Sequence, residues 1–137
     1  MRETELFQKF QPHLSKWGAY DRVENALGSG MSDVFYNIGG SVGWVETKVA
    51  KGDWIYFEKF QPNWINKHLR QGFRRMFILV MDKHETIHLW RAHQVLDVPR
   101  VPYEKWQCVN VNDLPRAVVE MYKPYRFWGL IKDELCS

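Results

Sequence analysis

The sequence predicts a single α/β domain in which helices flank a mixed β-sheet. Three observations support this fold class: apolar residues recur at helical spacing over residues 4–17, residues 33–49 read as two strands joined by a glycine turn, and residues 76–81 form an unbroken apolar run. An unbroken run of that length is typical of a central strand buried on both faces. Helices on the two faces of such a sheet complete the layers.

The other elements follow in order along the chain. The first helix is expected over residues 4–17, with Thr4 capping its start and Gly18 ending it. A short strand over residues 19–25 precedes the hairpin, and residues 50–58 after it are expected to form a loop. The remaining elements are a helix over residues 62–70, strands over 76–81 and 86–91, an irregular segment over 95–112 and a last helix over 113–122.

Composition sets broad limits on function. The chain has 137 residues, 45% hydrophobic and 15% aromatic, which suits one folded domain over residues 1–137. No apolar stretch approaches the roughly 18 residues of a spanning helix, and the N-terminus lacks a signal-peptide pattern, so we expect a cytoplasmic protein with no membrane association. Cys108 and Cys136 have no metal-binding spacing and are expected to be free thiols. The net charge of +3 permits nucleic acid as a partner without requiring it.

Three polar residues around the predicted hairpin carry the functional hypothesis. Asp33 opens the first strand and Glu46 lies near the far end of the second, so antiparallel pairing about the Gly39–Gly40 turn would bring the two carboxylates nearly opposite each other. Two carboxylates that close repel unless a cation lies between them. Lys48, two residues beyond Glu46, shares its face of the strand. The spacing D-x12-E-x-K therefore predicts a divalent metal with a lysine beside it.

The chemistry follows from these residue types. Carboxylate oxygens are hard ligands that suit Mg²⁺ or Mn²⁺ rather than Zn²⁺. Such a metal lowers the pKa of a bound water and neutralises a phosphate, while an adjacent lysine holds the water or stabilises charge on the phosphate. The alternative is that Asp33 ends a turn and that Glu46 and Lys48 decorate a solvated strand face.

The residues around this hairpin resemble the PD-(D/E)XK nuclease superfamily. The likeness rests on residues 30–34 (Gly-Met-Ser-Asp-Val) followed by residues 44–48 (Trp-Val-Glu-Thr-Lys), and it covers roughly residues 20–80. Residues 22–30 (Arg-Val-Glu-Asn-Ala-Leu-Gly-Ser-Gly) are similar to small phage members of the VRR-NUC and Holliday-junction-resolvase-like branch. The resemblance implies a restriction-endonuclease-like core in the order α-β-β-β-α-β.

The resemblance also implies an activity and roles for the residues. The activity is Mg²⁺- or Mn²⁺-dependent hydrolysis of DNA phosphodiesters, often by a homodimer, in a bacterial or phage-infected cell. In that scheme Asp33 and Glu46 hold the metal, assisted by the Thr47 carbonyl. Lys48 would orient the attacking water.

At three further positions this sequence departs from the family pattern or matches it in more than one way. Ser32 stands where the family has a structural proline. A glutamine in a P-x-Q-x-x-W-like pattern often follows the E-x-K strand, and either Gln61 or Trp64 fills that slot, according to whether the tryptophan or the proline anchors the match. The alternative for Gln61 is that it caps the helix. The upstream acid that commonly joins the catalytic site is taken as Glu24, with Glu5 on the first helix as the alternative.

A second motif points to different chemistry. Residues 84–88 (His-Glu-Thr-Ile-His) match H-E-x-x-H, the signature of zinc proteases, which requires a helix. The segment follows the apolar run 76–81 and contains Thr86 and Ile87, so we expect a turn and then a strand. The two histidines of a strand would lie about 13 Å apart, at roughly 3.3 Å per residue, which is too far for one zinc ion.

Candidate DNA contacts flank the predicted site. Basic side chains lie in the loop after the E-x-K strand and on or just after the following helix, where they would contact phosphates without reading sequence. They are Lys51, Lys67, Arg70, Arg74 and Arg75. Trp54 and Tyr56 in the loop would either stack on unpaired bases or pack in a core or dimer face. The alternative to a nuclease is a non-catalytic DNA-binding module on the same fold.

Overall fold

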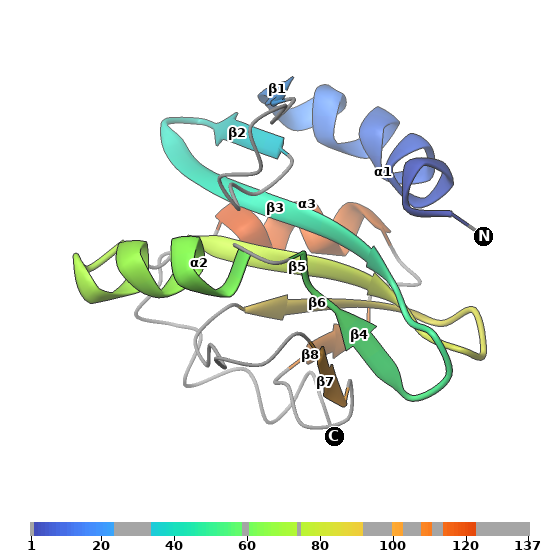
Figure 1. Ribbon diagram of the computed structural model, residues 1–137. Coiled ribbons are helices and arrows are strands. Elements are labelled where there is room, and N and C mark those ends of the chain that lie inside the picture. Colours follow the sequence, from blue (N-terminus) through green and yellow to red (C-terminus); the bar gives the residue numbers. More distant parts are fainter. Residues whose placement is uncertain are drawn as a thin grey trace.

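Two layers of helices enclose a central sheet in the computed structural model (Figure 1). The structure describes residues 2–23, 34–58, 61–73, 75–91, 100–102, 108–110 and 114–122, and the stretches 100–102 and 108–110 by their backbone alone. The elements are α1 (Glu3–Trp17), β1 (Ala19–Arg22), β2 (Val34–Ile38), β3 (Ser41–Val49), β4 (Trp54–Tyr56), α2 (Gln61–Arg70), β5 (Met76–Met81), β6 (Ile87–Arg91), β7 (Arg100–Pro102), β8 (Cys108–Asn110) and α3 (Leu114–Tyr122). Among the described residues, no helix is long and apolar enough to cross a membrane.

The sheet is mixed, as the sequence predicts. Its strand order is β1-β2-β3-β5-β6-β8, and a separate two-stranded sheet joins β4 to β7. The pair β3–β5 is parallel, with α2 in the crossover, whereas the other pairs are antiparallel. The unbroken apolar run of β5 lies in the middle of the sheet and is buried along its whole length. This central position is the one predicted for a strand covered on both faces.

The β2–β3 hairpin forms about the expected glycine turn. Gly39 and Gly40 have φ angles of +56° and +87°, the left-handed region that suits glycine in a tight hairpin. The Gly40 N–H donates to the Asn37 side-chain oxygen at 2.9 Å, which ties the turn to the end of β2. Further along β3, a Cβ atom at Gly43 would collide with the Tyr36 hydroxyl and the Arg75 carbonyl, so only glycine fits between these two neighbours.

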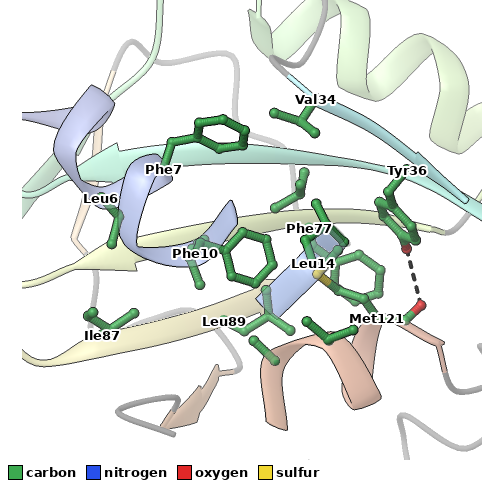
Figure 2. Packing of buried hydrophobic residues seen from close by; sticks show 14 of the residues in the cluster. Leu6, Phe7, Phe10, Leu14, Val34, Tyr36, Phe77, Ile87, Leu89 and Met121 are labelled. Atoms are coloured by element: carbon green, nitrogen blue, oxygen red, sulfur yellow. Dashed lines mark hydrogen bonds between the residues drawn. The ribbon is translucent and has the colours of Figure 1, made fainter. Parts of the chain in front are cut away.

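Helices α1 and α3 cover one face of the sheet. The apolar stripe of α1 is Leu6, Phe7, Phe10 and Leu14, and it packs on alternate residues of the central strands together with Met121 of α3 (Figure 2). The buried Tyr36 hydroxyl donates to the Met121 carbonyl at 3.1 Å, linking β2 to the end of α3. Burial raises the pKa of the Tyr36 phenol well above its ordinary value, although the nearby Arg75 opposes this shift.

Helix α2 and strand β4 cover the opposite face. Trp64, Ile65 and Leu69 of α2 form a second apolar cluster with Ile55 and Phe57 from β4 and the residue after it. This cluster rests on the other set of alternate residues in β5, so both faces of that strand are filled. The face under α2 is the one that receives the Lys48 side chain of β3.

Several sequence predictions need correction. The first helix begins at Glu3, with Arg2 before it and no side-chain cap, so the Thr4 cap was wrong. Residues 50–58 are not wholly a loop because they contain β4, and the segment 95–112 contains β7 and β8. The short strand ends at Arg22, and the helix bounds otherwise differ by single residues. Residues 111–113 lie outside the described part of the chain, which takes up α3 from Leu114.

Candidate active site

Strand β3 carries Glu46, Thr47 and Lys48 at the centre of the sheet. It lies between the antiparallel β2 and the parallel β5. The strand's alternation turns Glu46 and Lys48 toward α2 and Thr47 toward the opposite face. The exposed fractions are only 3% for Glu46 and 3% for Lys48, so the predicted alternative of a solvated strand face does not describe these residues. A carboxylate and an ammonium group buried this deeply require polar partners.

The partner of the Lys48 ammonium group is Gln61, the first residue of α2. Lys48 Nζ donates to Gln61 Oε1 at 2.9 Å, and Glu46 Oε1 lies 3.6 Å from the same nitrogen. Gln61 Oε1 also accepts the backbone N–H of Glu58 at 2.8 Å. One amide oxygen therefore holds both the lysine and the segment that leads into α2.

Apolar groups complete the surroundings of Lys48. The Phe57 ring lies with its centroid 5.5 Å from Lys48 Nζ, a cation–π distance. Trp44, two residues before Glu46, meets Trp64 of α2 edge-on at 5.5 Å. These rings reduce the local dielectric, which strengthens the attraction between the carboxylate and the ammonium group.

The described part of β2 begins at Val34, the residue directly after Asp33. Asp33 lies outside the described residues, as do Glu24 and Arg74. The β2–β3 register is described as far as Val34 opposite Val45. These two residues directly adjoin Asp33 and Glu46 in the sequence, so the hairpin register agrees with the predicted pairing up to that point.

The backbone of Thr47 faces the β2 side of β3. The Trp44 N–H donates to the Arg75 carbonyl at 2.8 Å, across to the start of β5. The Ala50 N–H likewise donates to the Met81 carbonyl at 2.8 Å, at the end of β5. Alternate residues of a ladder turn their N–H and C=O groups to the same neighbour, so the Thr47 carbonyl points away from β5.

The donor set on β3 suits a hard divalent cation. Glu46 offers carboxylate oxygens and Thr47 offers a carbonyl oxygen, and both are ligands that Mg²⁺ and Mn²⁺ prefer. Within the described part of the chain, no group of three or more His, Cys, Asp or Glu side chains comes together. That Asp33 completes a metal site with these donors stays a prediction, because Asp33 lies outside the described residues.

Glu5, the alternative upstream acid, lies on the first turn of α1. Its carboxylate forms an ion pair with the Arg2 guanidinium at 3.3 Å. Helix α1 packs on the sheet face opposite to the one that holds the Glu46 and Lys48 side chains. The structure therefore does not bring Glu5 together with these two residues.

The predicted DNA-contact residues fall into different environments. Lys67 and Arg70 are exposed on α2, and Lys51 is exposed just after the end of β3. Arg75 instead donates to the Met121 and Tyr122 carbonyls at 3.2 and 3.3 Å, at the C-terminal end of α3. A cation at that end of a helix satisfies carbonyls and the helix dipole, so Arg75 has a structural role.

The H-E-x-x-H motif forms a turn and a strand, as predicted. Asp82 organises this turn by accepting the N–H groups of His84 and Thr86 at 2.8 and 2.9 Å. Its second oxygen lies 3.0 Å from Nε2 of His88. Burial tends to raise the Asp82 pKa, but the bonds from His88 and the two N–H groups outweigh it, so the pKa lies below its usual value. His84 precedes β6 and His88 lies within it, so the pair does not have the helical spacing of a zinc protease.

The described fold is similar to a solved structure of Hjc, a Holliday junction resolvase from the archaeal hyperthermophile Archaeoglobus fulgidus. The TM-score is 0.58 at 12% identity, over 83% of this chain and 95% of that chain. The chain has a resolvase-like fold. The predicted α/β class with a restriction-endonuclease-like core is thereby confirmed. No protein-family model matches the chain, and no curated protein does.

Gln61 is the residue whose role the sequence left open. The family-like pattern offered either Gln61 or Trp64 for the glutamine slot. The structure brings Gln61 to Lys48 of β3, whereas Trp64 belongs to the apolar cluster beneath α2. Which of the two fills the family's glutamine slot stays a prediction, and spacing alone could not decide it because spacing does not say which residue of α2 reaches Lys48.

Proposed function

We propose that this protein is a Mg²⁺- or Mn²⁺-dependent deoxyribonuclease of the PD-(D/E)XK type that hydrolyses phosphodiester bonds in branched or junction DNA. The observation that carries the proposal is the buried Lys48 of β3, which contacts Glu46 on the same strand and Gln61 of α2 within a resolvase-like fold. Burying two opposite charges costs several kcal/mol per ion in lost hydration, which their mutual attraction must offset. A catalytic role explains why the protein places these two charged side chains here despite that cost. Strongly buried charged groups cluster at functional sites for this reason.

Each residue has a role that its placement supports. Lys48 holds the attacking water or the phosphate through its ammonium group, and Gln61 fixes the direction of that group. Glu46 and the Thr47 carbonyl supply oxygen ligands. Asp33 completes the ligand set if the β2–β3 register continues by one residue beyond Val34. The metal, when bound, would lower the pKa of water and neutralise the phosphate.

Exposed basic residues beside β3 provide the DNA contacts in this proposal. Lys51, Lys67 and Arg70 are exposed and can reach phosphates. Each such contact adds to affinity without reading sequence and weakens as salt rises. The proposal further places the chain in the VRR-NUC and Holliday-junction-resolvase-like branch, acting as a homodimer in a bacterial or phage-infected cell, with Glu24 as the upstream acid. Light scattering of the purified protein tests the dimer.

A cleavage panel tests the nuclease. Four-way junctions, flaps, single strands and duplexes would be incubated with the protein in Mg²⁺, in Mn²⁺ and in EDTA. The Asp33→Asn, Glu46→Gln and Lys48→Met variants should each lose about 100-fold or more in cleavage rate. Matched controls are Glu58→Gln and Lys9→Met, which change an exposed carboxylate and an exposed ammonium group and should cleave as the parent does.

Two results would count against the nuclease. Cleavage that persists in EDTA, or in folded Glu46→Gln and Lys48→Met proteins, would show that other residues do the chemistry. Junction binding with no cleavage in any metal would instead favour the non-catalytic DNA-binding module. Melting temperatures of all variants separate loss of chemistry from loss of fold.

A further inference from the structure

Strand β4 presents two aromatic rings to solvent on one face. Trp54 is 36% exposed and Tyr56 is 40% exposed, whereas Ile55 between them is fully buried. Residues two apart on a strand share a face and lie roughly 7 Å apart at about 3.3 Å per residue. Large aromatic side chains are more often buried, and a polar protein surface gains nothing from leaving two of them side by side in water.

A cation accompanies the rings. Lys51 Nζ lies 5.6 Å from the centroid of the Tyr56 ring. Gly52, with φ of +61°, allows the tight turn in which Lys51 and Trp54 bond through their backbones. The acidic residue of that turn, Asp53, is paired with Lys83 at 2.5 Å, so its charge is offset. The surface formed by Lys51, Trp54 and Tyr56 is therefore aromatic and locally basic.

This surface is joined directly to the candidate active site. Phe57, the residue after Tyr56, has its ring 5.5 Å from Lys48 Nζ. The next residue, Glu58, donates its N–H to the same Gln61 oxygen that binds Lys48. β4 also follows β3 through the tight turn (Figure 1). A ligand held on this surface is within one short segment of the catalytic strand.

We propose that Lys51, Trp54 and Tyr56 form a stacking platform for unpaired nucleobases, so that the protein selects DNA with single-stranded nucleotides beside the scissile bond. Aromatic rings and a lysine are the components with which proteins hold single strands: the rings stack on bases and the cation contacts the backbone. Bases inside a duplex are already stacked and do not offer their faces. The choice of DNA rests on the proposed nuclease function, but binding to the platform does not require catalysis.

The experiment measures binding without metal. A fluorescent oligothymidylate of about 15 nucleotides, which fits the usual site size, is titrated with the full chain in EDTA by anisotropy, beside a duplex of equal length. The Trp54→Ala/Tyr56→Ala double variant should weaken single-strand binding about tenfold or more and leave duplex binding within about twofold. Lys51→Met should lower the slope of log affinity against log salt by about 0.7, whereas the aromatic variant should leave that slope unchanged.

The matched control removes two other exposed rings. Trp17 and Tyr122 are 58% and 48% exposed and line an apolar hollow beside the β2–β3 turn. Trp17→Ala/Tyr122→Ala should bind both DNAs as the parent does. If the double variant of β4 melts early, Trp54→Leu/Tyr56→Leu keeps the apolar area, removes the rings and should show the same loss.

Three outcomes would overturn the platform. These are unchanged single-strand binding in the β4 variants, an equal loss for duplex and single strand, or an equal loss in the Trp17/Tyr122 control. Because binding is measured in EDTA, these outcomes are distinct from failure of the nuclease, which would appear as intact binding with no cleavage in Mg²⁺ or Mn²⁺.

Discussion

Replacing Gln61 by methionine tests the contact on which the candidate site depends. Methionine has nearly the same length and fits the same buried space, but its thioether is only a weak acceptor. The change removes the acceptor for Lys48 Nζ at 2.9 Å and for the Glu58 N–H at 2.8 Å. It leaves Lys48 with Glu46 Oε1 at 3.6 Å as its nearest charged partner.

The expected cost follows from these two bonds. A hydrogen bond to a charged group contributes about 1.5–3 kcal/mol and a neutral one about 0.5–1.5 kcal/mol. Burial of the more apolar methionine side chain offsets about 1 kcal/mol of this loss in stability. The net loss in the free energy of unfolding is therefore about 1–3.5 kcal/mol. With an unfolding entropy of about 2.1 cal/mol/K per residue, this corresponds to a fall in Tm of roughly 4–12 °C.

Thermal and urea unfolding measure this loss. Asn63→Met is the matched control, because Asn63 lies exposed on the same helix and its replacement should change stability by less than about 0.5 kcal/mol. A Gln61→Met protein that melts within about 1 °C of the parent would refute the reasoning, since the two bonds would then contribute nothing. An equal fall in the Asn63→Met control would point to a general effect of methionine on α2 rather than to Lys48.

Two other substitutions test the fold around the site. Gly43→Ala should lower stability by about 2–4 kcal/mol in urea unfolding, because a Cβ atom there meets the Tyr36 hydroxyl and a backbone carbonyl that cannot move aside easily. Asp82→Asn should lower stability by about 1–3 kcal/mol at pH 7. The Asp82 pKa is lowered in the folded state, so the carboxylate stabilises the fold above its unfolded pKa of about 3.9, and that stabilisation disappears as the pH falls through the lower folded value. The deficit of the Asp82→Asn protein should accordingly shrink below about pH 4.

Each of these substitutions has its own control. Ser41→Ala changes the same strand as Gly43 without a close neighbour to displace and should be nearly neutral. If Gly43→Ala were equally neutral, the close approach of the Tyr36 hydroxyl and the Arg75 carbonyl to Gly43 would be refuted. Asp53→Asn removes an exposed carboxylate and should cost no more than about 1 kcal/mol at any pH. A deficit for Asp82→Asn that is constant from pH 7 to pH 3 would contradict the pKa argument.

The sequence was sufficient for the elements whose patterns are local. The apolar run of β5 and the glycine turn of the β2–β3 hairpin are set by neighbouring residues, and the structure has both where they were predicted. Strand β4 was missed because it is three residues long and its residues Trp-Ile-Tyr are all large and apolar or aromatic, so the sequence does not show the alternation of exposed and buried side chains that the structure has. β7, its partner, contains a proline and is equally short.

The candidate site was predictable in part for the same reason. Glu46 and Lys48 share a face because strand geometry requires it. Their burial depends on how α2 docks across the sheet, and the bond from Lys48 to Gln61 joins residues 13 positions apart in the chain. Neither the burial nor this bond can be read from the spacing of neighbouring residues in the sequence. The pairing of Asp33 with Glu46 stays a prediction, since the register is described only from Val34.

The burial of Lys48 beneath α2 also makes this one amine chemically distinct. Reagents that acylate amines need a side chain that they can reach, and Lys48 is 3% exposed whereas Lys51 and Lys67 are exposed. Labelling of Lys48 therefore requires α2 and the Phe57–Glu58 segment to separate from β3, a local opening whose free energy sets the labelling rate relative to Lys51. Mass spectrometry of single lysines would read that opening directly, so Lys48 serves as a built-in reporter of how often the covering helix leaves the strand.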